Sequence, residues 1–253
     1  MGSLRDRHAL VTGGGRGIGL AVAQALTTAG ATVTVLGRDR DSLERAVRAG
    51  AARGAVVADV TDADSLSEAV AEARKARGAI DLLVANAGTA ESARFEKSDR
   101  ELFRRMLDVN FLGVVHAAQA VLAPMVERGF GRIVAVASTA GLKGYPYVSA
   151  YCAAKHAVVG LVRALALETA AAGVTVNAVC PGFTDTDLVA ESLDRIVART
   201  GRSREYALAE LMKHNPQQRL VQPREVADAV VWLCGEGAAA VTGQAIAVAG
   251  GEA

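Results

Sequence analysis

The chain has 253 residues, of which 51% are hydrophobic and 22% are charged, a globular composition that excludes a disordered chain. Its formal net charge is +1 and only 4% of its residues are aromatic, so neither a basic surface nor stacking rings indicate nucleic acid. We therefore expect one folded domain over residues 1–253 that acts on a small molecule, with no metal site.

The pattern of cysteines and the length of the apolar segments indicate the cellular compartment of the protein. Cys152, Cys180 and Cys234 are far apart and odd in number, which favours buried free thiols over a disulfide framework. No apolar segment reaches about 20 residues without a charge or a glycine, and residues 1–8 lack the apolar centre of a signal peptide. These patterns predict a cytoplasmic protein without membrane contact.

The first element is an apolar strand at residues 8–11, followed by a glycine-rich turn that begins at Thr12, contains Arg16 and Ile18, and opens a helical pattern. Gly13, Gly17 and Gly19 let the backbone turn tightly, approach a pyrophosphate and pack the new helix on its strand. The dipole at the N-terminus of the helix attracts phosphates. This order of elements predicts a dinucleotide site.

The second strand, residues 32–36, leads to Arg38 and Asp39, where NAD-binding proteins place an acidic residue for the adenosine ribose. The guanidinium of Arg38 can instead fork onto a 2′-phosphate, and Arg16 can approach that phosphate from the other side. This reading favours NADP(H). In the alternative, Arg38 is a solvated cation and Asp39 holds the ribose, which leaves NAD(H) possible.

Two further strands deliver polar residues to the same edge. Residues 55–58 lead to Asp59 and Val60, where Asp59 can accept from the adenine amino group, and a helix follows with Thr61 or Asp62 as its cap. Residues 80–84 lead to Asn86 and Gly88, where the missing side chain would let a cofactor lie against the backbone.

A helical pattern over residues 98–121 contains Asn110 in apolar surroundings. A polar group in such a place must find a partner. Asn110 either bonds a neighbouring helical turn or positions a water beside Lys155.

The strand pattern at residues 131–137 ends at Ser138, and a helical apolar pattern runs over residues 149–167. Tyr151 and Lys155 are four residues apart in it and share one helix face. The reference pKa of a phenol is about 10, and an ammonium one turn away favours the phenolate, so Tyr151 could exchange a proton.

Strands and helices alternate from the first strand to a strand at residues 174–179, and a last strand lies within residues 242–251. This order predicts an α/β protein with a doubly wound, parallel, seven-stranded sheet of the Rossmann type and helices on both faces. Ligands of such sheets bind beyond the carboxyl ends of the strands, where the residues above lie. Residues 184–220 are rich in helix formers and cations, with Ser203 as a helix cap, and we expect them to form a lid over the substrate.

The chain resembles the short-chain dehydrogenase/reductase family over nearly its whole length, because seven motifs occur in the family's order. They are Thr12-Gly-x-x-x-Gly-Ile-Gly19, Asp59, Asn86-Ala-Gly88, Asn110, Ser138, Tyr151-x-x-x-Lys155 and Pro181-Gly182 with Thr186. Within the family, the chain is similar to bacterial 3-oxoacyl-carrier-protein reductases and 3-hydroxyacyl-CoA dehydrogenases.

The resemblance implies a catalytic tetrad of Asn110, Ser138, Tyr151 and Lys155. Tyr151 would protonate a ketone oxygen that Ser138 holds, while the nicotinamide cofactor delivers a hydride to the carbon. Lys155 would bond the nicotinamide ribose, and Asn110 would link the site to solvent through water.

The resemblance also implies that Thr186 holds the nicotinamide carboxamide, that Pro181 and Gly182 line the nicotinamide, and that the protein is a homotetramer. We thus expect an NADPH-dependent reductase of a 3-oxoacyl thioester or related ketone in fatty acid or polyketide metabolism, with a CoA or acyl-carrier thioester as its partner. An NAD-dependent 3-hydroxyacyl-CoA or 3-hydroxybutyrate dehydrogenase is the alternative. A nucleotide-binding regulatory protein is the non-enzyme alternative, which the complete tetrad disfavours.

Overall fold

In the computed structural model, which describes residues 4–252 apart from the side chain of Arg199, seven strands form one parallel sheet in the order β3-β2-β1-β4-β5-β6-β7. The strands are β1 (His8–Thr12), β2 (Thr32–Gly37), β3 (Gly54–Val57), β4 (Leu82–Ala85), β5 (Gly131–Val136), β6 (Val174–Pro181) and β7 (Ala245–Val248). The predicted doubly wound Rossmann sheet is confirmed.

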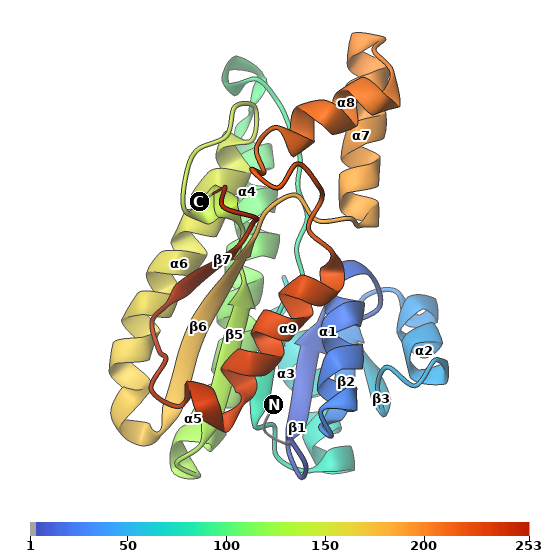
Figure 1. Ribbon diagram of the computed structural model, residues 1–253. Coiled ribbons are helices and arrows are strands. Elements are labelled where there is room, and N and C mark those ends of the chain that lie inside the picture. The colour runs from blue at the N-terminus through green and yellow to red at the C-terminus, as the bar shows by residue number, and fades with distance from the viewer. Residues whose placement is uncertain (1–3, 253) are drawn as a thin grey trace.

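Helices cover both faces of this sheet (Figure 1). They are α1 (Gly17–Thr28), α2 (Arg40–Arg48), α3 (Ala63–Arg77), α4 (Arg100–Leu107), α5 (Gly113–Glu127), α6 (Ser149–Thr169), α7 (Asp187–Thr200), α8 (Arg204–Met212) and α9 (Pro223–Cys234). Buried residues of α3, α5 and α6 belong to one apolar cluster, and those of α1, α2 and α9 belong to a second. The sheet therefore separates two cores.

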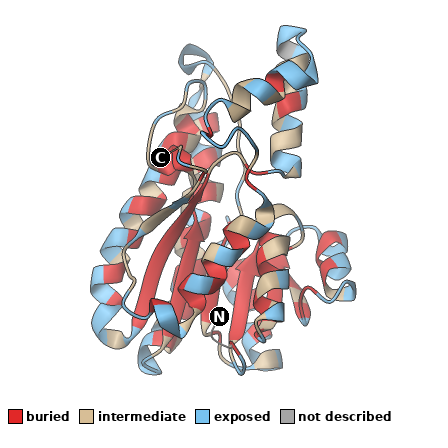
Figure 2. Ribbon diagram, in the orientation of Figure 1, coloured by how far each residue is buried: buried red, intermediate tan, exposed pale blue. Residues whose placement is uncertain are grey.

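Strand periodicity explains the two cores, because successive side chains point to opposite faces. Leu10 of β1 lies in register with Leu83 of β4, which is paired with Ile133 of β5, and all three belong to the first cluster. Their neighbours Val11 and Val84 belong to the second cluster. Figure 2 shows β1, β4, β5 and β6 buried almost throughout. A sheet with two buried faces holds the loops at its edge rigidly.

Capping side chains determine where α3 and α8 begin. The Asp62 carboxylate caps α3 by accepting from the backbone N–H groups of Asp64 and Ser65, so Asp62 rather than Thr61 is the cap. The Ser203 hydroxyl caps α8 as predicted. The three cysteines are buried and free, which confirms that prediction.

The helical pattern at residues 98–121 is not one continuous helix. α4 ends at Leu107, a π-helical turn spans Asp108–Leu112, and α5 begins at Gly113. The wider turn contains the buried Asn110, whose Nδ2 donates to the Met106 carbonyl at 3.0 Å. Turns of this kind are frequent at functional sites, and this one aims an amide that a regular helix would place differently.

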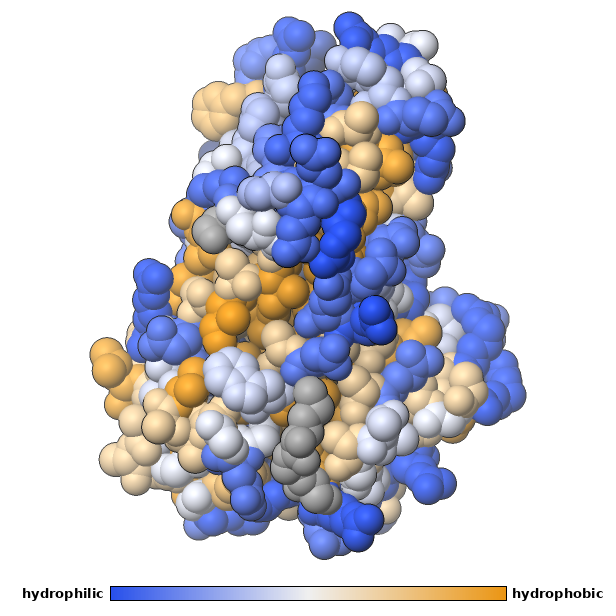
Figure 3. Space-filling view, in the orientation of Figure 1, coloured by the Kyte–Doolittle hydropathy of each residue, from blue (hydrophilic) through white to orange (hydrophobic). Residues whose placement is uncertain are grey.

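The segment between β6 and β7 contains α7 and α8, which project beyond the carboxyl ends of the strands (Figure 1). Its base is closed by backbone pairing: the Asp185 N–H donates to the Val221 carbonyl, and the Val221 N–H donates to that of Phe183, both at 2.9 Å. Figure 3 shows hydrophilic residues over the outer end of this projection and apolar surface where it meets the body.

Two helical stretches, Arg100–Glu127 and Ser149–Ala172, are long and apolar enough to cross a membrane by length and composition alone. In this fold, α5 packs on β4 and β5, and α6 packs on β6. Their apolar faces are thereby used within the α/β core.

Candidate active site

The predicted site residues lie where strands of the sheet end. The strand order reverses between β1 and β4, and parallel sheets bind ligands in the crevice beyond such a switch point. Thr12 ends β1, Asn86 follows β4, Ser138 follows β5 closely, and Pro181 ends β6. Residues far apart in the chain thus meet at one edge.

Helix α6 brings Tyr151 and Lys155 to this edge. Tyr151 is hydrogen-bonded to Ser138, and Lys155 Nζ lies 5.7 Å from the centroid of the Tyr151 ring. Lys155 is buried, and its Nζ donates to the Val136 carbonyl at 2.9 Å. The structure therefore gathers Ser138 and Lys155, two of the predicted catalytic residues, around the Tyr151 phenol.

Burial sets the proton affinities of this pair. It raises the pKa of Tyr151 to about 12, although the hydrogen bond with Ser138 acts in the opposite direction. It also lowers the pKa of Lys155 to about 8. The sequence pattern predicts a Tyr151 made acidic by Lys155. In this structure the loss of solvation dominates the pKa of Tyr151, so the phenol stays protonated at neutral pH.

Asn110, the fourth predicted catalytic residue, lies beside Lys155 across Gly88. A Cβ atom at residue 88 would be 2.8 Å from Asn110 Oδ1 and 3.7 Å from Lys155 Nζ. Asn110 Oδ1 also accepts from the Thr89 N–H at 3.2 Å. Asn110 thus bonds the neighbouring helical turn through Nδ2, while its Oδ1, with a second lone pair, faces the region of Lys155.

The glycine-rich turn has the geometry that a pyrophosphate requires. Gly13 and Gly17 have φ angles of 65° and 54°, in the left-handed region that glycine tolerates best. A Cβ atom at Gly19 would lie 2.5 Å from Asn86 Nδ2 and would overlap the Gly13 carbonyl. Arg16 precedes α1 without a side-chain cap, so the first N–H groups of this helix are available to an anion.

Asn86, the residue after β4, holds the glycine-rich turn in place through hydrogen bonds. Its Nδ2 donates to the Thr12 carbonyl at 3.0 Å, and its backbone N–H donates to the Thr12 hydroxyl at 3.0 Å. Thr186 approaches from the other side, since a Cβ atom at Gly17 would lie 3.4 Å from Thr186 Cγ2. The strand ends, the turn and the start of α7 therefore form one continuous cradle that fits a dinucleotide.

Arg38, after β2, and Asp59, after β3, lie together at the same edge of the sheet. Arg38 Nη1 lies 3.5 Å from Asp59 Oδ2, and the Arg38 side chain is 75% exposed. Burial alone would raise the pKa of Asp59, but hydrogen bonds from Thr61 and the charge of Arg38 hold it below its usual value. Asp39 caps α2 by accepting from the Asp41 N–H at 3.1 Å. Arg38 is thus the more available of the two neighbouring residues.

Val60 and Gly182 also lie at this edge. Val60 is buried, and its carbonyl is bonded to Nδ1 of His116 on α5 at 2.9 Å. The Gly182 N–H donates to the Val248 carbonyl at 3.1 Å, which ties the residue after β6 to β7. His116 has no motif of its own in the sequence, so the sequence did not reveal this contact.

A polar and aromatic cluster near Ser138 was also missed. Tyr145, Phe183 and His214 have ring centroids between 5.6 and 6.0 Å apart, and Tyr145 donates a hydrogen bond to Glu252. These residues come from four separate segments, so no local pattern could have revealed the cluster.

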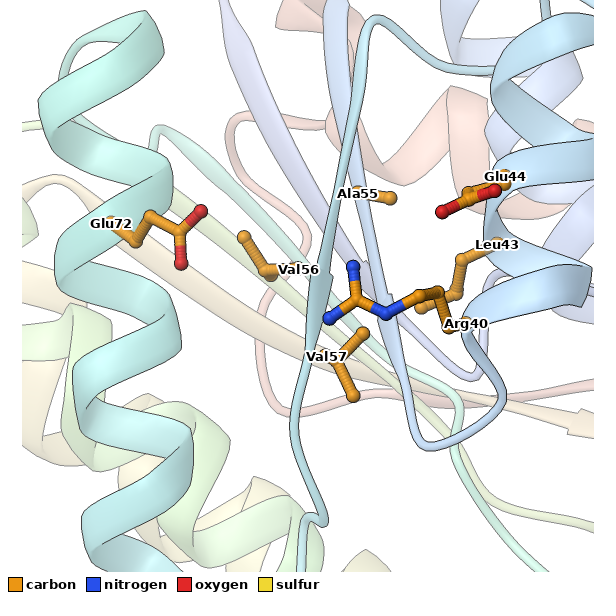
Figure 4. A pocket seen from close by; sticks show the side chains of 7 residues that line it. All are labelled: Arg40, Leu43, Glu44, Ala55, Val56, Val57 and Glu72. Carbon is orange, nitrogen blue, oxygen red and sulfur yellow. The ribbon is translucent and has the colours of Figure 1, made fainter.

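A hollow of about 210 Å³ lies elsewhere, along the edge strand β3 between α2 and α3 (Figure 4). Its lining residues are Arg40, Leu43, Glu44, Ala55, Val56, Val57 and Glu72. None of them is a predicted site residue. Among residues 4–252, apart from the Arg199 side chain, no group of three or more His, Cys, Asp or Glu side chains is arranged to hold a metal ion.

Comparison with known proteins agrees with this geometry. The family model for short chain dehydrogenase matches residues 7–196. An acetoacetyl-CoA reductase of Shinella zoogloeoides is 34% identical over 247 residues, covering 98% of this chain and 98% of the relative. A D-beta-hydroxybutyrate dehydrogenase of Rhizobium meliloti (strain 1021) is 35% identical over 252 residues, covering 97% and 98%.

A solved structure gives the same result for the fold. The crystal structure of a variant of actinorhodin polyketide ketoreductase with NADPH superposes with a TM-score of 0.94 at 38% sequence identity. The match covers 100% of this chain and 99% of that one. The similarity therefore includes α7, α8 and the residues after β7.

Proposed function

Since this chain belongs to the short-chain dehydrogenase family, we propose that it reduces a 3-oxoacyl thioester, or a related ketone, with NADPH. The family and its oxidoreductase relatives show an NAD(P)-dependent enzyme that acts on a ketone or its alcohol. The non-enzyme alternative is thereby set aside. The observation that carries the proposal is the half-buried, protonated Tyr151 beside Ser138 and Lys155 at the edge that holds the glycine-rich turn.

Each residue has a task that its surroundings support. A bound nicotinamide dinucleotide supplies the hydride. Tyr151 donates its proton to the ketone oxygen, and Ser138 holds that oxygen and orients the phenol. Lys155 contacts the nicotinamide ribose, and Asn110 holds a water that replaces the proton.

Cofactor binding is assigned to the cradle. Backbone groups of Gly13, Gly17, Ile18 and Gly19 hold the pyrophosphate at the start of α1. At the adenosine end, Asp59 and Val60 border the adenine, and Asn86 and Gly88 lie along the ribose. At the other end, Pro181 and Gly182 line the nicotinamide, and Thr186 bonds its carboxamide.

The protonation state of the Tyr151 phenol supports the proposed reduction. A pKa of about 12 keeps Tyr151 protonated across the neutral range, which is the form that gives a proton to a ketone. Alcohol oxidation requires the phenolate, and burial disfavours that form. The resting site thus supports reduction.

The preference for NADPH is assigned to Arg38 together with Arg16. Arg38 is exposed and already adjacent to a carboxylate, which indicates that its guanidinium lies near the adenosine end of the cradle. Asp39 is engaged as the cap of α2, so it is less free to hold a ribose. A 2′-phosphate would exchange the ion pair between Arg38 and Asp59 for a charge-assisted fork.

One observation favours the alternative, an NAD-dependent 3-hydroxyacyl-CoA or 3-hydroxybutyrate dehydrogenase. The ion pair at 3.5 Å already occupies Arg38, and breaking it would weaken any gain from a 2′-phosphate. A protein that prefers NADH would place this alternative first.

The assembly is proposed as a homotetramer in the cytoplasm. Large apolar residues are exposed on three helices: Val126 of α5 at 42%, Leu167 of α6 at 85% and Trp232 of α9 at 44%. Exposed apolar patches often mark contacts between subunits, and these side chains lie on helices of both faces of the sheet. Light scattering after size-exclusion chromatography measures the mass, and a monomer would contradict this proposal.

A substrate panel tests the proposed function. Acetoacetyl-CoA, an acetoacetyl-carrier-protein thioester, cyclic ketones and sugars are each mixed with NADPH and with NADH, and cofactor absorbance is followed. We expect the acetoacetyl thioesters to give the highest kcat/KM, and with NADPH. If a sugar or a simple cyclic ketone is preferred, the thioester assignment is wrong while the ketone reductase remains.

A further inference from the structure

Glu252, four residues after β7, has a fully buried side chain next to the candidate active site. Its Oε1 accepts from the Tyr145 hydroxyl and lies 3.5 Å from Lys143 Nζ. The same Lys143 Nζ donates to the Glu252 main-chain oxygen at 2.8 Å. Glu252 is therefore held in place by three contacts from the segment that follows Ser138, two to its carboxylate and one to its main chain.

The second carboxylate oxygen, Oε2, is buried and has no hydrogen-bond partner among the described residues. A buried acceptor without a donor is costly, and native structures contain few of them. An acceptor of this kind next to a candidate active site indicates a donor that arrives with a ligand.

The location of Oε2 places it beside the reacting groups. A Cβ atom at Gly182 would lie 3.0 Å from Oε2, so the carboxylate packs on the backbone that the proposed function assigns to the nicotinamide. Tyr145, which binds Oε1, is 2.7 Å from the hydroxyl of Thr139, the residue after Ser138. Glu252 thus lies in the wall beside Gly182 and Thr139, the neighbours of the proposed reacting groups.

Tyr145 cannot supply a second donor. A phenol carries one hydrogen, and the contact with the carboxylate uses it, so the Thr139 hydroxyl donates to Tyr145. Lys143 already serves Oε1 and the main chain. Phe183 and His214 contribute rings to this wall. No described residue donates to Oε2, so this acceptor is free for a donor on a ligand.

Building on the proposed ketone reduction, we propose that Glu252 selects ketones that carry a hydroxyl donor a few bonds from the carbonyl, such as a hydroxylated or enolised chain. The hydroxyl donates to Oε2 while the ketone oxygen faces Ser138 and Tyr151. A substrate with an apolar group in place of the hydroxyl leaves Oε2 without a hydrogen-bond partner. A substrate with a carboxylate there is repelled by the negative charge of Glu252. Sites with an acceptor of this kind reject analogues that lack the donor.

Three ketones of matched skeleton test this inference: 4-hydroxycyclohexanone, 4-methylcyclohexanone and 4-oxocyclohexanecarboxylate, each with saturating NADPH. The measured quantity is the ratio of kcat/KM for the hydroxy ketone to that for the methyl ketone. We expect about ten- to a hundredfold in the unmodified protein, the range for a hydrogen bond to a charged group. Glu252→Gln keeps the shape and should lower the ratio several-fold, and Glu252→Leu should bring it to about one.

Glu68→Gln, an exposed carboxylate on α3, is the matched control and should leave the ratio unchanged. If Glu252 is only a tether for its segment, Glu252→Leu lowers kcat/KM for all three ketones equally, and the inference is wrong. A ratio near one in the unmodified protein, or a preference for the carboxylate through Lys143, also overturns it.

The proposed function fails in a distinguishable way. If none of the three ketones and no thioester is turned over with either cofactor, the ketone reductase itself is contradicted, and the inference falls with it. If thioesters are reduced but the hydroxyl has no effect, only the inference about Glu252 is overturned.

Discussion

Residues 8–88 and the wall around Glu252 form opposite sides of the same site, and they are constructed differently. On the nucleotide side, each strand delivers its functional residue to the loop directly after it, and backbone groups make many of the contacts. On the other side, Tyr145 and Glu252 are 107 residues apart and meet through side chains alone.

This difference indicates where substitutions are tolerated. The turn at Gly13 and Gly19 tolerates few substitutions, because an added Cβ atom at either position would lie within 3 Å of Asn86 Nδ2. A wall made of side chains can change its chemistry while the sheet stays intact. One frame can thus keep a common cofactor while its substrate changes.

The largest expected effect is at the junction of the two sides. Tyr151→Phe should lower turnover by about two to four orders of magnitude, because a positioned general acid contributes about that much. NADPH binding, measured by quenching of protein fluorescence, should remain nearly intact. A Phe variant that keeps more than a tenth of wild-type turnover would remove Tyr151 from this role.

Lys155→Met should act on both sides, raising the KM for NADPH and lowering kcat, each by about ten- to a hundredfold for a lost charge-assisted bond. The pKa of Lys155 is lowered to about 8, so the ammonium is lost as pH rises through 8. Wild-type NADPH binding should weaken over that range, and the variant should show no such pH dependence. An identical pH dependence in both proteins would assign it to another group.

Arg38→Ala tests the nucleotide side alone. It should raise the KM for NADPH by about ten- to a hundredfold while leaving that for NADH within a few-fold. The acid–base groups are not altered, so kcat at saturating NADPH should change little. Equal effects on both cofactors would make Arg38 a general support for the cradle.

Gly19→Ala breaks the cradle itself. The added methyl would overlap the Gly13 carbonyl, and such overpacking costs about 1–3 kcal/mol of folding free energy. NADPH binding should weaken by about tenfold or more. Gly160→Ala on α6 is the matched control, since its Cβ atom would meet no atom within 4 Å. The control should gain about 0.5–1 kcal/mol of stability, and a similar gain in Gly19→Ala would contradict the tight turn.

The smallest effect is expected at the base of α9. Glu225 binds Arg219 through two contacts of 2.7 Å, and the Arg219 contact together with the Gln222 N–H lowers the pKa of Glu225 to about 2. A depressed carboxyl pKa stabilises the fold above the ordinary value of 4.5, and that contribution is lost as pH falls toward 2.

Glu225→Gln should therefore lower the melting temperature by about 1–4 °C at pH 7, and the difference from wild type should shrink below pH 4.5. Glu68→Gln serves as the control. A difference that grows on acidification would have the wrong sign for this ion pair.

The nucleotide side could be predicted from the sequence because its signals are local. The spacing of Gly13, Gly17 and Gly19 after a strand indicates the turn, and the spacing of Tyr151 and Lys155 places both on one face of α6. The doubly wound, parallel sheet followed from the alternation of strands and helices. Helix ends were predicted to within a few residues, since Asp62 and Ser203 are strong caps.

Long-range effects could not be predicted in the same way. The π-helical turn at Asn110 depends on tertiary packing, and no spacing rule indicates it. Whether the pKa of Tyr151 is raised or lowered depends on how far the phenol is buried, and the apolar pattern of α6 does not give that burial. Glu252 looks like an ordinary polar residue in the sequence, and only the fold places its carboxylate beside Gly182.

The most direct test of the central claim is the loss of cofactor absorbance when the wild-type protein is mixed with acetoacetyl-CoA and either NADPH or NADH. The account predicts reduction with both cofactors and a kcat/KM about ten- to a hundredfold higher with NADPH. No loss of absorbance with either cofactor, or a higher kcat/KM with NADH, would contradict it.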